Sequence, residues 1–141
     1  MIAALRSRFL VVFILTVGCS STKVLEYDGA KVVHGTGGAK ETVDGIDIWK
    51  VGEPNGDYQI IGVVEDEYLD NGSPLGSLVA GNSSRSRIVK AAKEKGANGI
   101  IFISQNRTPT GFAGQVNSSG NFYANRRSAV ARQAALIRYV K

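Results

Sequence analysis

Gly45–Glu65, GIDIWKVGEPNGDYQIIGVVE, sets the architecture that we expect of this chain. Apolar and polar residues alternate from Gly45 to Val51, in a run rich in strand-forming side chains. The segment Glu53–Asp57 contains Pro-Asn-Gly, a tight-turn signal, because glycine accepts a positive φ and asparagine tolerates one. A second alternating run follows over Tyr58–Glu65. We therefore predict an antiparallel hairpin over 45–65.

A helix is predicted after this hairpin. Turn-forming residues fill Glu65–Gly81, which indicates a loop, and the helix is expected from about Arg85 to Lys95. Gly96 stands where a left-handed C-cap is wanted. The candidate N-caps are three consecutive polar residues, Asn82, Ser83 and Ser84. The apolar positions that would face the sheet recur at helical spacing and are Ile88, Ala91 and Ala92.

The C-terminal third is predicted to supply the rest of the sheet. Ala97–Ser104 is a compact apolar run that indicates a buried strand. Gln105–Asn125 is rich in Gly, Asn, Ser and Thr and is interpreted as a loop or long hairpin excursion. Residues 128–139 mix strand and helix formers; we predict a final strand, with a helix as the open alternative. The fold class is therefore α+β, a single small domain in which one helix packs on an open antiparallel sheet. A short strand over Lys31–His34 is also compatible with this pattern.

The N-terminus has the pattern of an export signal. Arg6 and Arg8 precede the apolar run Phe9–Val17, which ends at Gly18-Cys19. This run has nine residues (17 − 9 + 1), whereas a membrane-spanning helix needs roughly twenty. We therefore predict a signal peptide. An ordinary export signal with a coincidental cysteine, or an uncleaved N-terminal anchor, remains an alternative.

Val17-Gly18-Cys19 resembles the lipobox of bacterial lipoproteins, with Thr16 where leucine is usual. The resemblance implies that 1–18 is removed and that Cys19 becomes an acylated N-terminus embedded in the membrane. Ser20 is not aspartate, which in enteric-type sorting implies the inner leaflet of the outer membrane, facing the periplasm. Residues 19–30 are then expected to be a lipidated tether, and 31–141 the folded domain.

The counts of cysteine and histidine exclude several classes of site. Cys19 is the only cysteine, so the chain has no intramolecular disulfide, no CxxC redox motif and no multi-thiolate zinc site. His34 is the only histidine, which excludes a histidine-rich metal site. We expect no metal and no cofactor.

Charge is distributed unevenly along the chain. Residues 23–70 hold 11 acids and 4 bases, a net charge of −7 (4 − 11), whereas 71–141 hold 11 bases and 1 acid, a net charge of +10 (11 − 1). Such asymmetry can mark a basic face for lipopolysaccharide phosphates, phospholipid headgroups or acidic cell-wall glycans, and no RNA-binding motif is present. We favour the other interpretation, in which the two halves fold onto each other and their charges mostly interleave. The candidate contact residues are Arg85, Arg87, Lys90, Arg126 and Arg127.

Three short motifs carry a family resemblance. They are Tyr58-x-x-Ile61-Gly62-x-Val64, the run Ala91–Ile101 with its Gly-Ala-Asn-Gly turn, and the closing Ala135–Tyr139. Together they resemble small bacterial envelope lipoproteins of unknown function. The resemblance covers roughly 45–104 and the C-terminal stretch. It implies an α+β fold and location in the envelope, and no activity.

Catalytic patterns are sparse. Glu65, Glu67 and Asp70 could provide acid/base chemistry in a small envelope hydrolase, which is our alternative hypothesis. His34 has no third group to complete a triad. The acidic run Asp66–Gly72 departs from a calcium loop at Tyr68. Our main hypothesis is a non-catalytic, lipid-anchored adaptor, sensor or structural component that binds another envelope protein, lipopolysaccharide or glycan, but no nucleic acid.

Overall fold

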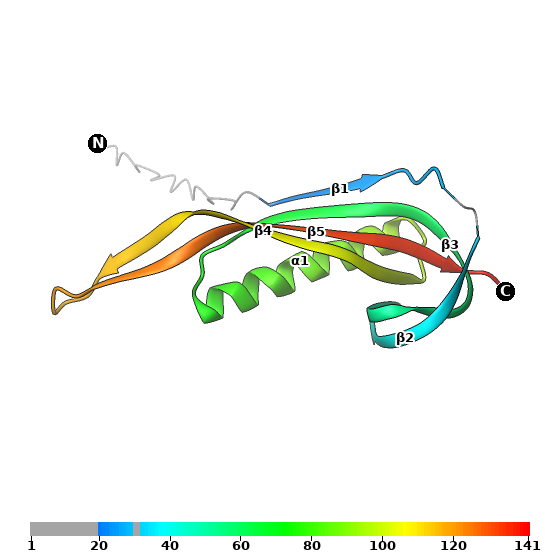
Figure 1. The fold of residues 1–141 in the computed structure, drawn as a ribbon, viewed down its shortest axis with the longest axis horizontal. Helices are drawn as coiled ribbons and strands as arrows, with labels where there is room; N and C mark the ends of the chain where they lie inside the picture. Colours follow the sequence, from blue (N-terminus) through cyan, green and yellow to red (C-terminus); the bar gives the residue numbers. More distant parts are fainter. Residues whose placement is uncertain (1–19, 30–31) are drawn as a thin grey trace, which may run out of the picture.

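The computed structural model describes residues 20–29 and 32–141, so the predicted signal peptide and Cys19 lie outside the described residues. One helix packs on a mixed five-stranded sheet (Figure 1). The α+β class predicted from the sequence is therefore confirmed. The elements in chain order are β1 (Ser21–Leu25), β2 (Val33–Val43), β3 (Ile46–Asp70), α1 (Pro74–Glu94), β4 (Gly99–Val116) and β5 (Phe122–Tyr139).

The hairpin predicted over 45–65 is wrong in its position. The turn lies at Asp44-Gly45, where both residues have positive φ (52° and 79°), and it joins β2 to β3. Aspartate and glycine tolerate this conformation, and paired positive φ values match the twist of a two-residue hairpin. Pro54-Asn55-Gly56 lies inside β3, where Asn55 pairs with Thr36 and Gly56 with Gly35.

β3 is a single long strand of 25 residues that pairs along its whole length. Near its start, Asp47–Trp49 runs parallel to Gly99–Ile101 of β4, and the part from Tyr58 to Asp70 runs antiparallel to β5. Gly52 and Gly56 have positive φ between these two parts, where register shifts mark irregular pairing with β2. The glycines that suggested a turn therefore bend a continuous strand.

β4 and β5 form a long hairpin that replaces the loop predicted over 105–125. Their pairing continues from Gly99↔Ile137 out to Val116↔Phe122, and the far part projects beyond the helix (Figure 1). At the tip, Asn117 Oδ1 accepts hydrogen bonds from the backbone N–H groups of Ser119 (3.0 Å) and Asn121 (2.8 Å). The prediction of a final strand over 128–139 is confirmed.

The segment 19–30, expected to be a tether, contains a strand of the sheet. Ser21–Leu25 forms β1 and pairs antiparallel with β3, from Ser21↔Glu67 to Leu25↔Val63. Val24 packs against the core whereas its neighbours Lys23 and Leu25 are exposed, which is the alternation expected of a strand at the sheet.

The helix is about twice as long as predicted, because it extends further toward the N-terminus. It begins at Pro74 instead of Arg85, because Ser73 caps it by accepting a hydrogen bond from the Gly76 N–H (3.1 Å) and proline suits the first turn. β3 extends to Asp70, so the loop expected over 65–81 is reduced to a short connection. The predicted sheet-facing residues Ile88, Ala91 and Ala92 are buried, as expected.

The core is divided between the two faces of the sheet. On the helix side, meaning the face that α1 covers, strand residues at alternate positions pack against the helix; the fully buried ones include Ile48, Val64, Ile100, Ala134 and Leu136. On the open side, Trp49, Tyr58, Ala135 and Ile137 form a second cluster. Trp49 donates a hydrogen bond to Tyr139 (3.2 Å), so its ring packs inside the protein.

We expect Asp44→Val to destabilise the protein by about 1–2 kcal/mol relative to Asp44→Asn, because a β-branched residue is strained at positive φ whereas asparagine tolerates it. Both variants remove the same carboxylate and its 3.5 Å ion pair with Lys93, so the comparison isolates backbone strain. Urea denaturation measures the difference. Equal stabilities would show that Asp44-Gly45 is not the turn.

Candidate functional site

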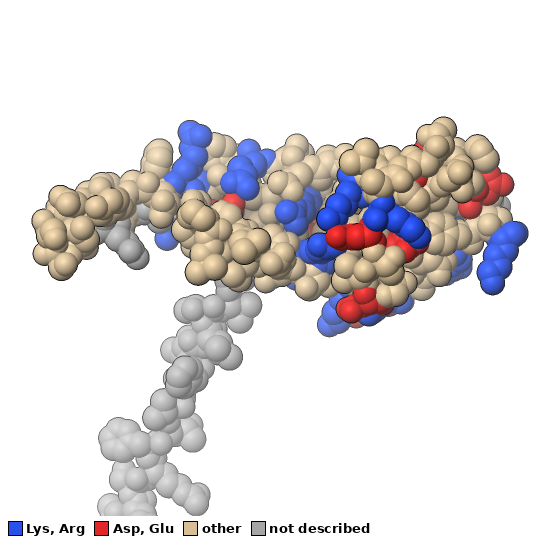
Figure 2. Space-filling view, turned by 90° about the horizontal axis from the view of Figure 1, so that it is seen from below, with Lys and Arg blue, Asp and Glu red and all other residues tan. Residues whose placement is uncertain are grey.

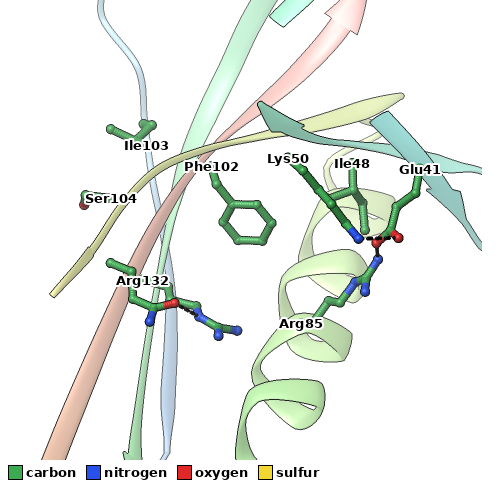
Figure 3. Close-up of a pocket in the computed structure, with 9 residues that line it drawn as sticks. Glu41, Ile48, Lys50, Arg85, Phe102, Ile103, Ser104 and Arg132 are labelled. Carbon is green, nitrogen blue, oxygen red and sulfur yellow. Dashed lines mark hydrogen bonds and ion pairs between the residues drawn. The ribbon is translucent and has the colours of Figure 1, made fainter. Parts of the chain in front are cut away.

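A cavity of about 370 Å³ opens on the helix side of the sheet, between α1 and the strands (Figure 3). Its lining comes from every element except β1, and consists of Glu41, Ile48, Lys50, Arg85, Phe102, Ile103, Ser104, Gln105 and Arg132. Figure 3 shows the Phe102 ring between two polar groups, Lys50–Glu41–Arg85 on one side and Arg132 on the other. The cavity therefore combines an aromatic wall with charged ends.

Strand alternation places Glu41, Ile48, Lys50 and Phe102 on one face. Ile48 pairs with Glu41, and Phe102 pairs with Ala134, so all four lie on the helix side. A register shift between Phe102 and Ser104 leaves Ile103 as an extra residue in β4. Such a bulge re-aims the side chains that follow it, which brings Gln105 opposite Arg132.

One end of the cavity is an ion-pair group centred on Glu41. Lys50 Nζ lies 2.7 Å from Glu41 Oε2, and Arg85 pairs with the other carboxylate oxygen. Two cations therefore share one anion. The Nε of Arg85 is buried beside the cavity and has no hydrogen-bond partner among residues 20–29 and 32–141.

The other end is held by Arg132. Its Nε donates to Gln105 Oε1 (2.7 Å), and its Nη1 donates to the Gly81 carbonyl of α1 (3.1 Å). The guanidinium also lies over the Tyr68 ring, 5.3 Å from the centroid, in a cation–π contact. Arg132 thus links strand to helix and keeps a fixed positive charge at the cavity rim.

This arrangement is suited to recognition of a small anionic group attached to an apolar body. The lining carries three cations, Lys50, Arg85 and Arg132, against one carboxylate, Glu41. Ser104 Oγ donates to Gln133 (3.1 Å), so the hydroxyl is paired away from any base. Cations that converge around an aromatic surface bind and orient an anionic ligand. General acid–base catalysis would instead need a titratable side chain within hydrogen-bond reach of the reacting group.

Asp66 of β3 is fully buried between the sheet and α1. Arg87 of α1 donates two hydrogen bonds to its carboxylate, from Nε to Oδ1 and from Nη2 to Oδ2, each 2.7 Å long. Thr22 of β1 donates to the same carboxylate. Burial acts to raise the pKa of Asp66, but the hydrogen bonds that the carboxylate accepts, first those of Arg87, and the charge of Arg87 together hold the pKa below its ordinary value of 3.8. This contact joins β1, β3 and α1.

A second buried carboxylate lies at the end of β3. Asp70 accepts hydrogen bonds from Ser77 Oγ (2.6 Å) and from the Gly72 N–H (2.9 Å), and pairs with Arg107 at 2.9 Å. The Ser77 hydrogen bond is the largest cause of a lowered pKa for Asp70. The carboxylate therefore anchors the start of α1 and the base of the β4–β5 hairpin.

The five basic residues predicted as one face are not gathered into one patch. Arg85 lines the cavity, Arg87 is occupied by Asp66, and Lys90 is exposed on the helix. Arg126 and Arg127 are exposed near the far end of the sheet, on opposite faces of β5. The backbone of Arg126 lies against Gly72, and α1 rises about 16 Å between its first turn and Arg85, so the two groups are separate.

The acids and bases of the two chain halves pair extensively. Among the described residues, four ion pairs connect an acid from 23–70 to a base from 71–141, and they are Glu41–Arg85, Asp66–Arg87, Asp44–Lys93 and Asp70–Arg107. Folding therefore interleaves these charges, as the sequence analysis favoured over a single basic face.

The carboxylates considered for hydrolysis are separated by the sheet. Glu65 lies on the open side, where Gln133 donates to it (2.6 Å), and Glu67 is exposed on the same side. Asp70 is buried on the helix side in the contacts described above. His34 is exposed and lies 2.6 Å from Asp57, with no nucleophile in this contact.

The residues that form the cavity were largely missed by the sequence analysis. Only Arg85 was among the candidates, because Glu41, Lys50, Phe102 and Arg132 carry no local motif. A usable signal was the alternation of β3, which places Asp66 on the same face as the buried Val64 and thereby marks a carboxylate that needs a cationic partner.

Within residues 20–29 and 32–141, no group of three or more His, Cys, Asp or Glu side chains is placed to hold a metal ion. The helix of the described chain lacks the apolar length needed to cross a bilayer. Comparisons with protein-family models, curated proteins and solved structures found no match to this chain. Functional inference therefore depends on the residues themselves.

We expect Arg87→Leu to lower the free energy of unfolding by about 3–5 kcal/mol at neutral pH, because it leaves the Asp66 carboxylate buried without its cation. Chemical denaturation measures the loss. Lys90→Leu is the matched control on the same helix, since Lys90 is exposed, and it should change stability by about 0.5 kcal/mol or less.

The pH dependence gives a second readout of the same pair. In the unaltered protein the pKa of Asp66 is lowered, so its contribution is present above the ordinary value of 3.8 and is lost as pH falls through the lowered pKa. Arg87→Leu removes the hydrogen bonds and the charge of Arg87 while burial remains, so the pKa of Asp66 rises relative to the unaltered protein and the deficit should shrink on acidification. A deficit independent of pH would contradict this account.

Proposed function

We propose that the protein is a lipid-anchored component of the bacterial cell envelope that binds another envelope molecule and has no catalytic role. The observation that carries the proposal is the position of the lone cysteine. Cys19 ends a signal-like sequence, and β1 begins only two residues later, at Ser21. A lipid on this cysteine would hold the α+β domain directly at a membrane surface.

The cavity on the helix side supports a binding role. The buried Nε of Arg85 beside it has no hydrogen-bond partner in the part of the chain that the structure describes, Lys50 is accessible, and Phe102 provides an apolar wall. An anionic group of lipopolysaccharide, a cell-wall glycan or an envelope protein has the chemistry that these side chains recognise. The polar groups form ion pairs and amide contacts, which favours adaptor, sensor or structural activity over hydrolysis.

The lipid anchor is tested by labelling. We expect radiolabelled palmitate to enter the protein and the label to be lost in Cys19→Ser, which should move from the membrane to the soluble fraction. Attachment through several acyl chains is effectively permanent, whereas removal of the thiol leaves no site for them. Ser20→Ala is the matched neighbour and should keep the label. Membrane association unchanged by Cys19→Ser would overturn the proposal.

The proposed location in the inner leaflet of the outer membrane is tested separately. The lipobox resemblance implies that aspartate after the acylated cysteine retains a lipoprotein at the inner membrane. We therefore expect Ser20→Asp to shift the protein to inner-membrane fractions on a sucrose gradient, with Ser20→Asn as the uncharged control of similar size. Equal distributions of the two variants would place the protein elsewhere.

A further inference from the structure

The projecting end of the β4–β5 hairpin, residues 111–127, is amphipathic; we call it the arm. Its cross-strand pairs Phe112↔Arg126 and Val116↔Phe122 place these side chains on one face, with only Gly114 and Ala124 between them. Tyr123, Asn125 and Arg127 occupy the other face. One face of the arm is therefore an apolar stripe with an arginine at its base.

This stripe has no cover within the described residues. Phe112, Val116 and Phe122 are 66–71% exposed, whereas the corresponding positions of β5 nearer the core, Ala134 and Leu136, are buried by α1. The even-numbered residues of β5 lie on the helix side throughout. The stripe therefore continues the helix-covered face of the sheet beyond the N-terminal end of α1 (Figure 1). The apolar stripe is thus exposed to solvent, although the same face of the sheet is buried where α1 covers it.

The first turns of α1 add to this apolar surface. Leu75, Leu78 and Val79 recur at spacings of three and four and are 57–72% exposed. Ser77, on the other face of the same turns, bonds to Asp70 at the base of the arm, so the helix begins beside the arm and shows its apolar residues to solvent. Two exposed apolar features thus share one end of the molecule.

The proposed anchor belongs to the same end. β1 runs from Ser21, opposite Glu67, toward Leu25, opposite Val63, while β3 runs toward Asp70 and the arm. The chain therefore enters β1 from the arm end of the sheet. Two residues span at most about 7 Å, so a lipidated Cys19 would hold this end within headgroup reach of its bilayer.

The charge of this end suits an anionic surface. No acidic residue follows Glu94 in the sequence, and Arg126 and Arg127 are exposed at the base of the arm. Figure 2 shows the arm as a nearly uncharged projection with Lys and Arg at its base, while the acidic side chains visible on this face gather mainly toward the other end. Aromatic residues beside arginines match the apolar–polar boundary of a lipid leaflet.

We propose that the arm and the first turns of α1 form a membrane-seating surface, in which Phe112, Val116 and Phe122 enter the interface of an anionic phospholipid bilayer and Arg126 and Arg127 bind its headgroups. This rests on the lipid anchor proposed above. The anchor fixes the protein to the bilayer, and the seating surface fixes its orientation, which turns the opposite end toward the periplasm.

The test uses the full-length lipidated protein reconstituted in vesicles of phosphatidylethanolamine and phosphatidylglycerol, with an indole introduced as a reporter. Phe122→Trp places it on the apolar face of the arm, and Tyr123→Trp, the matched control, on the other face one residue away. Both positions are exposed, and the only native indole, Trp49, is buried in both variants. Emission wavelength and quenching by brominated acyl chains are measured.

We expect the indole at position 122 to emit at shorter wavelength and to be quenched roughly twofold or more strongly than the one at 123. Adding Arg126→Gln and Arg127→Gln should reduce that quenching toward the level on phosphatidylcholine vesicles, because the headgroup attraction is lost. Phe112→Ser combined with Val116→Ser, at exposed positions that leave the core intact, should do the same.

Other outcomes overturn the proposal at separate points. If the protein floats with vesicles but position 122 remains as solvent-exposed as 123, the seating surface is wrong and the anchor stands. If position 122 is protected only in native envelope membranes, the stripe binds a protein, which also overturns lipid seating. If the protein does not float at all, the anchor fails, and the seating proposal that rests on it fails too.

Discussion

β3 is the constraint on which the rest of the fold depends, because this one bent strand pairs with all four others. Its first part holds β2 and the start of β4, and its second part holds β1 and β5. The bend at Gly52 and Gly56 allows both parts to contribute to the same core. The cavity beside Ile48 and Lys50, and the pairing that sets where the arm begins, both follow from this geometry.

Buried carboxylates then fasten the helix to this strand. Asp66 and Asp70 lie on the helix side of β3 together with Val64 and Tyr68. They are buried there, and an unpaired buried carboxylate would be costly in free energy. Arg87 from α1 and Arg107 from β4 neutralise them. The acidic first half and basic second half of the chain are thus drawn together, while Arg126 and Arg127 at the base of the arm take part in none of the ion pairs of the described residues.

The molecule has two dissimilar ends as a result. At the arm end, apolar side chains are exposed, the first turns of α1 are uncovered, and the chain enters β1 shortly after Cys19. Toward the other end lie the β2–β3 hairpin and the C-terminus (Figure 1). The helix-side cavity lies between them, with Arg85 and Arg132 on its rim. This difference between the two ends suits a protein that is held at a membrane surface by one end and binds partners along its side.

Local pattern was sufficient for the α+β class, for burial of Ile88, Ala91 and Ala92, and for the final strand, since side-chain periodicity reports directly which face is buried. It was insufficient to choose between Asp44-Gly45 and Pro54-Asn55-Gly56, because both accept positive φ and only the strand pairs on either side select the turn. The Asp66–Arg87 pair, the cavity and the β1 pairing likewise required tertiary structure. Each depends on elements that are distant in the sequence, such as Asp66 and Arg87, 21 positions apart, and no local propensity encodes such a contact.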